Sequence, residues 1–469
     1  MRACVLCLRV ATAKQGRQAG THHGAQKQLN LLVQTRHMLL KKIFLLLCIF
    51  SAIILSAQPR PNIIYIMADD LGYADLSCYG RKDYQTPNLD HFASQGIKFM
   101  NAYAAAPVCT PTRVAFFTGR YPARLPVGLY EPLAEGHKDS LLGLTAETPS
   151  IAGLLKKSGY ETYLVGKWHL GYLPAFSPMA NGFDYFFGFH AGATDYFSHI
   201  NEEGKPDLYE NDEPIKRQGY ITDLFMEKAV EIISKPHQKP FFLAVTFNAP
   251  HWPWQGPADK PYTADWIQGG SPSIYAAMMK SLDDAVGKIV KTIDDLKLSN
   301  NTVIIFTSDN GGERYSDNGI YKEGKMSLRE GGIREPAMVR WPGKIKENSI
   351  TNQVVTTMDW SATILSLAKA AVDPKFPLDG IDVMPIIMGQ KKETERVLYW
   401  RIFQRKQHKA MRDGKWKYFQ DEKGNEYLFD LSADPKEDNN LKDQQPGIFN
   451  KLKDQYGEWE KTVLKPIPL

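Results

Sequence analysis

Residues 61–72 read PNIIYIMADDLG, an unbroken apolar run that ends in two aspartates. A run of this kind is typical of a strand that is buried on both faces of a parallel sheet. Three further segments have the same form: YETYLVGKWH at 160–169, KPFFLAVTFNAPH at 239–251 and NTVIIFTSDNGG at 301–312. Together the four segments predict the central strands of one sheet.

Helical patterns lie between these strands, at 148–159, 220–235 and 273–297. Alternation of strands and helices predicts an α/β domain with a mainly parallel central sheet flanked by helices. After about residue 372 the pattern changes to short alternating segments, which predict an antiparallel sheet, followed by a helical segment. We therefore expect a catalytic domain over residues 58–372 and a smaller α+β subdomain over residues 373–469.

The N-terminal segment is basic and is expected to be a leader. Residues 1–57 contain eight Lys or Arg and no Asp or Glu. From Met38 the chain shows two lysines, an apolar run and small residues, which is the pattern of a secretory signal peptide with cleavage near Ala57 and Gln58. A membrane anchor is the alternative, but the apolar run is short for a span. The sequence thus predicts export to the periplasm or the medium, with translation starting at Met38.

The net charge of +5 arises from this leader. The rest of the chain has 49 basic and 52 acidic residues, which gives no basic surface for nucleic acid. Only Cys78 and Cys109 remain after the leader. Free cysteine is commonly buried, and we expect Cys78 to be a small buried residue.

Each of the four predicted strands ends in polar, chemically capable side chains. In open α/β sheets, ligands bind beyond the carboxyl ends of the strands. The residues at these ends are Asp69, Asp70, Lys167, His169, His251, Asp309 and Asn310. Three carboxylates and one amide are oxygen donors, which favour calcium first and magnesium second. Such a cation indicates an anionic substrate, a phosphate or sulfate ester.

Cys109 lies in the stretch APVCTPTRVAFFTGRYPAR, residues 106–124. Cys109 and Arg113 are four residues apart and therefore share one face of a helix that begins near Pro111. The positive end of that helix favours an anion or an activated nucleophile. A bare thiolate is a poor match for a hard cation, so we expect the cysteine to be chemically changed.

CTPTR followed by TGRYP resembles the signature of the type I sulfatases, whose motif cysteine is oxidised to formylglycine during export. Other blocks resemble the family in the same order: MADDLGYADLSCYG, GKWHLG, FNAPHWPW, TSDNGG, GKMSLREGGIREPAMVRWPG and YLFDLSADPKEDNNL. Within the family the resemblance is to secreted bacterial polysaccharide sulfatases of the arylsulfatase A and N-acetylgalactosamine-6-sulfatase type. It implies an alkaline-phosphatase-like fold with a smaller C-terminal domain, as the strand pattern also predicts.

The resemblance also implies roles for individual residues. One calcium ion would be held by Asp69, Asp70, Asp309, Asn310 and the Cys109 position. Cys109, converted to formylglycine (3-oxoalanine) by a maturation enzyme, would as its hydrate attack sulfur and form a sulfated hemiacetal that collapses to release sulfate. Its catalytic companions would be Arg113, Lys167, His169, His251 and Lys325. Lys325 is assigned through GKMSLREGG, because the preceding segment departs from the family pattern.

The substrate is expected to be a sulfated sugar. Aromatic and polar side chains near the predicted cleft suit a sugar ring, and the candidates are His190, Asp195, His199, Trp252 and Arg314. Two other functions compete with this interpretation. A phosphoester or phosphonate hydrolase shares the fold, but a phosphate usually brings a second metal or more cations. A catalytically inactive carbohydrate-binding protein is the second alternative, but it would have no need for the complete set of proposed catalytic residues that this sequence contains.

Overall fold

The computed structural model describes residues 27, 29–42, 60–134, 142–261 and 269–467. Residues up to Pro59 and residues from Arg60 onward form two separate compact units. In the first unit, residues 29–42 are helical, and most of the predicted signal peptide, with its cleavage site, lies outside the described residues. No described helix is both long enough and apolar enough to cross a membrane.

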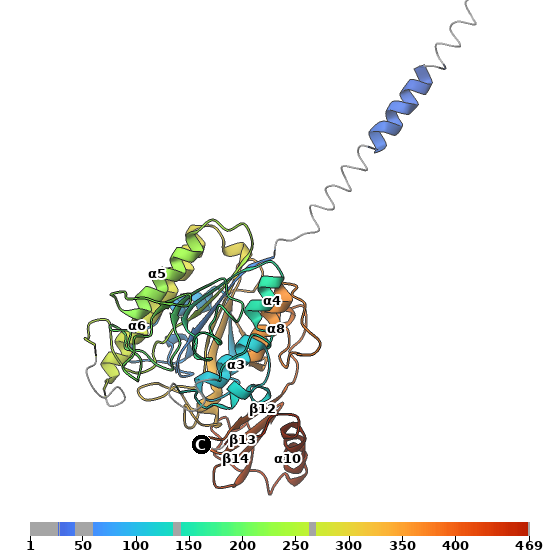
Figure 1. Cartoon of the computed structure of the whole chain (residues 1–469). Coiled ribbons are helices and arrows are strands. Elements are labelled where there is room, and N and C mark those ends of the chain that lie inside the picture. Colours follow the sequence, from blue (N-terminus) through green and yellow to red (C-terminus); the bar gives the residue numbers. More distant parts are fainter. Residues whose placement is uncertain (1–26, 28, 43–59, 135–141, 262–268, 468–469) are drawn as a thin grey trace, which may run out of the picture. The chain divides into compact units, whose positions relative to one another are not determined.

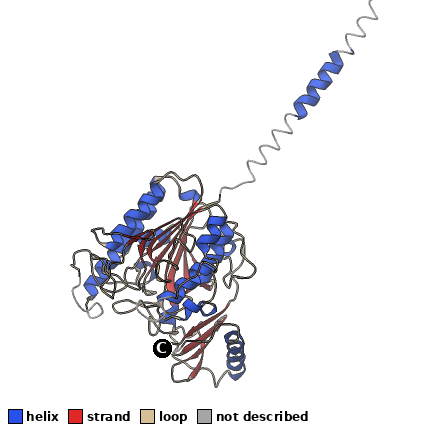
Figure 2. Ribbon diagram, viewed as in Figure 1, coloured by secondary structure: helices blue, strands red, loops and turns tan. Residues whose placement is uncertain are grey.

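The second unit is built on one large sheet, drawn as red arrows in Figure 2. Its strand order is β10-β2-β9-β8-β1-β7-β3-β4-β5-β6, with β11 paired to β2. The four strands expected from the sequence are β1 (Asn62–Ala68), β3 (Glu161–Lys167), β7 (Phe241–Thr246) and β8 (Thr302–Ser308). They are neighbours in the order β8-β1-β7-β3 and all run parallel. The predicted mainly parallel centre is therefore confirmed.

Helices cover both faces of this sheet, as Figure 1 shows. One face carries α3 (Cys109–Thr118), α4 (Ile151–Lys157) and α8 (Thr357–Leu367). The other face carries α2 (Pro87–Ser94), α5 (Ile221–Ser234) and α6 (Pro272–Asp295). Alternate residues of β1 point to opposite faces, so Ile63 and Tyr65 join one apolar core while Ile64 and Ile66 join the other. Burial on both faces explains why β1 is apolar throughout.

A second sheet lies in the C-terminal part of the chain. Four strands form an antiparallel meander: β12 (Val397–Ile402), β13 (His408–Asp413), β14 (Trp416–Gln420) and β15 (Glu426–Asp430). The closing helix α10 (Pro446–Glu460) packs on one face through Leu452, Tyr456 and Trp459. The other face, with Trp400 and Phe419, packs in the same apolar cluster as Val108 and Cys109. The second sheet therefore packs against the start of α3.

The remaining elements extend the large sheet or connect its parts. They are β2 (Ile97–Tyr103), β4 (Tyr185–Phe189), β5 (Tyr209–Glu210), β6 (Glu213–Pro214), α7 (Glu330–Ile333), β9 (Arg334–Arg340), β10 (Ser349–Thr351), β11 (Val355–Thr356) and α9 (Met384–Ile387), with short 3-10 turns at Ser77–Tyr79, Pro122–Arg124, Pro126–Leu129 and Ser299–Asn301. β9 runs antiparallel to both β2 and β8. The sheet is therefore mixed at its edges and parallel at its centre.

A buried ion pair network joins the two sheets. Lys417 of β14 is fully buried, and its ammonium lies 2.8 Å from Glu330 and 3.0 Å from Glu437. Glu330 also accepts hydrogen bonds from Tyr103 at 2.7 Å and Arg334 at 3.0 Å. Glu330 and Tyr103 belong to the region of the large sheet, so Lys417 ties the second sheet to the first.

We expect Lys417→Met to lower the free energy of unfolding by about 3–5 kcal/mol, because two buried carboxylates lose their shared counter-charge. Lys415→Ala is the matched control. Lys415 sits two residues away, is half exposed, and pairs with Asp430 at 2.6 Å; its loss should cost less than about 1 kcal/mol. Urea unfolding at pH 7 measures both, and equal losses would contradict the network's role.

Candidate active site

The carboxyl ends of the four central strands bring the predicted site residues together. Asp69 and Asp70 follow β1, and Asp309 and Asn310 follow β8. Lys167 ends β3, His169 follows it, and His251 comes five residues after β7. Every one of these side chains is buried. A parallel sheet forces this convergence, because its strands all end at the same edge.

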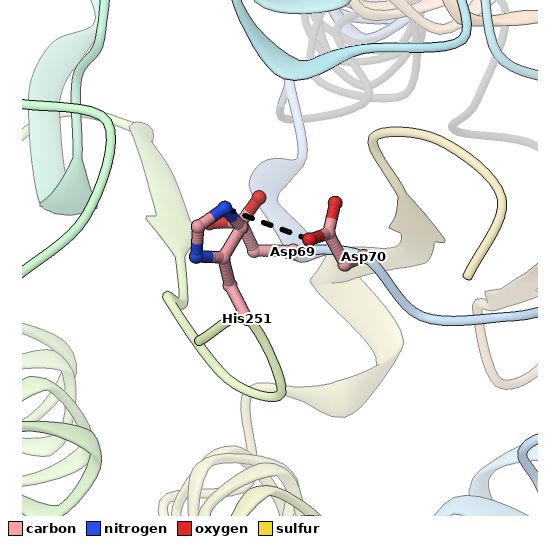
Figure 3. A group of neighbouring side chains, drawn as sticks. All are labelled: Asp69, Asp70 and His251. Carbon is pink, nitrogen blue, oxygen red and sulfur yellow. Dashed lines mark ion pairs between the residues drawn. The ribbon is translucent and has the colours of Figure 1, made fainter. Parts of the chain in front are cut away.

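The carboxylates form a tight group. Ligand atoms of Asp69, Asp70 and His251 all lie within 4.8 Å of one another, and Figure 3 shows the His251 ring directed at Asp70, 3.5 Å away. Asp309 Oδ1 accepts a hydrogen bond of 3.1 Å from the backbone N–H of Asp70. The Asn310 amide donates to Asp70 Oδ1 at 2.7 Å. All four oxygen-bearing side chains expected to bind the metal are thus in one cluster.

Three cationic side chains balance these three carboxylates. Arg113 donates to Asp309 at 3.1 Å and lies 3.6 Å from Asp69. Lys167 donates to Asp69 at 2.6 Å, and Lys325 donates to Asp70 at 2.7 Å. The pairing keeps a strongly charged site stable in the protein interior.

The charges shift the pKa values of the cluster in opposite directions. Burial and the neighbouring charge of Asp69 raise the pKa of Asp309 to about 7. Burial also acts on Asp70, but the charge of Lys325 and the hydrogen bonds from Lys325 and Asn310 outweigh it and hold the pKa of Asp70 below its usual range. Neighbouring carboxylates that cannot all ionise freely are the environment in which an added cation is strongly favoured.

Two buried oxygens of the cluster support a cation site. Asp69 Oδ1 and Asn310 Oδ1 accept no hydrogen bond from any described residue. A buried oxygen without a donor is destabilising unless another positive group meets it. Together with Asp70 and Asp309 they make an all-oxygen donor set, which fits a hard cation such as Ca²⁺.

Cys109 is the first residue of α3 and is buried. Its neighbours include Lys167 and Lys325, whose charges act on the thiol, yet burial raises its pKa to about 11. A thiol with that pKa is protonated at neutral pH and is a weak nucleophile. The geometry therefore places Cys109 beside the carboxylate cluster but does not activate it as a thiolate. Cys78, in contrast to our expectation, is only partly buried, and both cysteines are free.

The protonation of the two histidines follows from their contacts. His251 Nδ1 lies 2.5 Å from the carbonyl oxygen of Trp252, so Nδ1 carries the proton and donates. Its Nε2 then accepts from the Lys325 ammonium, 3.2 Å away. Burial and the charge of Lys325 lower the pKa of His251 well below its ordinary value. The proton nearest this part of the site therefore resides on Lys325.

His169 is arranged in a similar way. Its Nε2 lies 2.8 Å from the carbonyl oxygen of Leu133, which makes Nε2 the donor. Burial and the charge of Lys167 lower its pKa well below the ordinary value, so it is neutral. Nδ1 is buried and has no partner among the described residues. His169 lines the same cavity as Cys109.

A cavity of about 380 Å³ opens over this cluster. Cys109, His169, His251 and Lys325 line it, so the predicted catalytic groups are accessible to a small ligand. Its volume is in the range of small-molecule sites. Of the five predicted substrate residues, Trp252 lines the cavity.

The other four predicted substrate residues lie outside the cavity lining and make local contacts. His190 packs between the rings of Phe186 and Tyr209. Asp195 accepts from the backbone of Phe197 and Ser198, and Gln255 donates to it. His199 bonds to the carbonyl of Gly219, and Arg314 lies over the rings of Trp254 and Tyr315. Their role in substrate binding stays a prediction.

Seven residues with charged or amide side chains that sequence reasoning missed line the cavity: Glu131, Asn201, Glu202, Glu203, Glu313, Gln404 and Arg405. They come from four separate segments, and one of these is the loop between β12 and β13. Nothing in the local sequence marks them. Only Glu313, three residues after Asn310, lies close in sequence to a predicted metal ligand.

The comparisons with known proteins agree with this geometry. Residues 61–370 match the family model described as Sulfatase, and residues 319–461 match a model described as N-sulphoglucosamine sulphohydrolase, C-terminal. N-acetylgalactosamine-6-sulfatase of Canis lupus familiaris is 33% identical over 76% of this chain and 72% of its own length. Arylsulfatase A of Homo sapiens is 32% identical over 76% and 73%. A crystal structure of Ps i-CgsB in complex with k-i-k-neocarrahexaose superposes with a TM-score of 0.79 at 30% identity, covering 87% of this chain and 94% of that chain.

Proposed function

The chain belongs to the sulfatase family, and on this premise we propose that it removes sulfate from a sulfated carbohydrate with a formylglycine nucleophile and one calcium ion. The names of similar proteins support a sugar substrate: one is an N-acetylgalactosamine-6-sulfatase, and another was solved with a neocarrahexaose. A cavity of about 380 Å³ can hold a sugar ring.

One observation carries the proposal. Cys109 begins α3 one turn before Arg113. Its thiol interacts electrostatically with four charged side chains: Lys167, Lys325, Asp69 and Asp309. With a pKa of about 11 the unmodified thiol is protonated at neutral pH and is a weak nucleophile. Conversion to formylglycine, whose hydrate carries two hydroxyl groups on one carbon, would supply both a nucleophile and a second hydroxyl for the release of sulfate.

The metal ligands would be Asp69, Asp70, Asp309, Asn310 and the modified side chain at position 109. Bound Ca²⁺ would supply positive charge that favours ionisation of the nucleophile and offsets the charge of the sulfate. Arg113 and Lys167 are paired with Asp309 and Asp69 and would hold the nucleophile.

Residues that line the cavity would bind the sulfate and deliver a proton to the leaving oxygen. His169 and Lys325 would bind the sulfate oxygens. Lys325 holds the proton nearest to His251 Nε2, so these two side chains form the path along which a proton would reach the leaving oxygen. A sugar alkoxide needs such a proton because it is a poor leaving group.

Sulfate release tests the function directly. Protein from a host that matures sulfatases is incubated with sulfated monosaccharides and with the corresponding phosphate esters, and free sulfate and phosphate are measured by ion chromatography. We expect sulfate from at least one sugar and little phosphate. Release of phosphate without sulfate would support a phosphoester hydrolase instead.

Removal of the metal should abolish turnover, and calcium should restore it better than zinc, because every proposed protein ligand is an oxygen donor. Calcium should also raise the thermal stability of the wild type, by about 2.7 kcal/mol at a concentration 100 times its Kd. Asp309→Asn should lose both the activity and this calcium-dependent shift. Asp83→Asn, a change at an exposed carboxylate that pairs with Arg81, is the control and should keep both. Full activity of metal-free protein would contradict the ligand assignment.

Export is part of the proposal. The expected signal peptide would carry the chain to the periplasm or the medium, and a maturation enzyme would convert Cys109 on the way. The proposed catalytic and C-terminal domains would divide near residue 372, after α8 and before the second sheet.

A further inference from the structure

The cavity over the active site is rich in carboxyl groups. Among the described lining residues, Glu131, Glu202, Glu203 and Glu313 are acidic, whereas only Lys325 and Arg405 are basic. Lys325 is already paired with Asp70 at 2.7 Å and with Glu313 at 3.5 Å. The lining therefore has more carboxyl groups than basic groups, which is unexpected in a site for an anionic substrate.

Glu131 is held rigidly with one oxygen unused. It is 7% exposed, and its Oε2 accepts hydrogen bonds from the backbone N–H groups of Phe403 at 2.7 Å and Gln404 at 2.8 Å. The Gln404 side chain in turn accepts from the backbone N–H of Glu131 at 2.8 Å. Oε1 has no hydrogen bond among the described residues. Burial raises the pKa of Glu131 to about 7, so a donor placed at Oε1 would stabilise its charged form.

Glu202 approaches the same place from another loop. A Cβ added at Gly192 would lie 3.0 Å from His169 Nε2 and 3.6 Å from Glu202 Oε1, so His169 and Glu202 flank one point. Glu202 makes no hydrogen bond or ion pair with any residue that the structure describes. Glu203 differs, because its carboxylate is paired with Lys205 at 2.8 Å.

Glu131 and Glu202 line the same cavity as Cys109 and His169, the residues proposed to meet the sulfate. Leu133, two residues after Glu131, bonds through its carbonyl to His169 Nε2, and its backbone N–H donates to Thr110, next to Cys109. A sugar ring whose sulfate meets His169 and Cys109 would therefore present its other substituents to Glu131 and Glu202. Carboxylates accept hydrogen bonds from hydroxyl and ammonium groups and repel a second anion.

We propose that Glu131 and Glu202 are specificity residues that bind hydroxyl or ammonium groups of the ring bearing the scissile sulfate, so that a ring with one sulfate is accepted and a ring with two is rejected. This inference rests on the proposed sulfatase function. Selection of this kind works by repulsion of the wrong ligand as well as by attraction of the right one.

Binding to the full-length Cys109→Ser protein tests the inference without turnover. Isothermal titration gives the Kd of two matched pairs: N-acetylgalactosamine 6-sulfate against its 4,6-disulfate, and glucosamine 6-sulfate against its N,6-disulfate. We expect the monosulfated ring to bind at least about tenfold more tightly in one pair or both, which is about 1.4 kcal/mol. Equal or tighter binding of both disulfated rings, or no binding by any of the four, would overturn the proposal.

Three further variants test which carboxyl groups cause the preference for the monosulfated ring. Glu202→Gln and Glu131→Gln should each reduce the preference at least about threefold, since the amide keeps the shape but removes the charge. Glu203→Gln is the matched control and should leave the preference unchanged, because Glu203 is already neutralised by Lys205. Glu202 is exposed, so its variant keeps the fold even if the Glu131 variant does not. An unchanged preference in Glu202→Gln would overturn the assignment. Failure of the proposed sulfatase function would be seen in a separate measurement, because the wild-type protein would then release no sulfate.

Discussion

Cys109→Ser is expected to lower sulfate-ester hydrolysis at least about 10⁴-fold in a host that oxidises only cysteine, as removal of a nucleophile does in other hydrolases. A serine hydroxyl could accept the sulfate but offers no second hydroxyl to release it. The buried Cys109 thiol, with its pKa of about 11, would not substitute either if left unmodified. Initial rates on a sugar sulfate and on 4-nitrophenyl sulfate measure the loss.

Cys78→Ser is the matched control. Cys78 is only partly buried, is free, and has a pKa that burial and Asp90 raise to about 12. Its backbone N–H donates to Asp90 and its carbonyl accepts from Lys98, neither of which belongs to the proposed site, so its variant should keep wild-type rates. Substantial activity in Cys109→Ser, or equal losses in the two variants, would remove Cys109 from the nucleophile role.

His251→Ala is expected to reduce hydrolysis of a sugar sulfate by about 10²–10⁴-fold while affecting 4-nitrophenyl sulfate far less. Nitrophenolate leaves without a proton, whereas a sugar alkoxide does not. In the structure His251 Nε2 accepts from Lys325 at 3.2 Å, so loss of the imidazole interrupts the proposed path of the proton. Lys325→Ala should show the same substrate dependence and should also raise KM, because Lys325 would bind sulfate.

Arg113→Ala is the comparison for this experiment. Arg113 is paired with Asp309 and Asp69 and would serve the nucleophile, so both substrates should lose activity to the same extent. The kcat and KM values of all three variants are compared on both substrates across pH. Equal losses on the two substrates for His251→Ala would remove it from the leaving-group role.

Much of the fold could be predicted because its centre is a parallel sheet. β1, β3, β7 and β8 are buried on both faces, which leaves a continuous apolar signal in the sequence. The edges were not predicted. β5, β6 and β11 are two residues long, and β9 follows the short helix α7 without the long crossover that marks a parallel strand.

The residues of the site also fall into those that could be predicted from the sequence and those that could not. Asp69, Asp70, Asp309 and Asn310 directly follow strands, so their convergence could be predicted from strand order alone. Lys325 came only from the family resemblance, since it lies far beyond β8. Glu131 and Glu202 could not be predicted, because loops separated widely in the sequence bring them to the cavity that His169 also lines. Trp252 lines the cavity, and its role in substrate binding stays a prediction.

Mass spectrometry of the peptide that contains Cys109 tests the central claim most directly. The sample is wild-type protein that hydrolyses a sulfate ester and comes from a host with the maturation system. We predict a peptide about 18 Da lighter than the cysteine form, as replacement of CH₂–SH by an aldehyde requires, and capture of that peptide by an aldehyde-reactive hydrazide. An active preparation in which the peptide carries only an unmodified thiol would contradict the account.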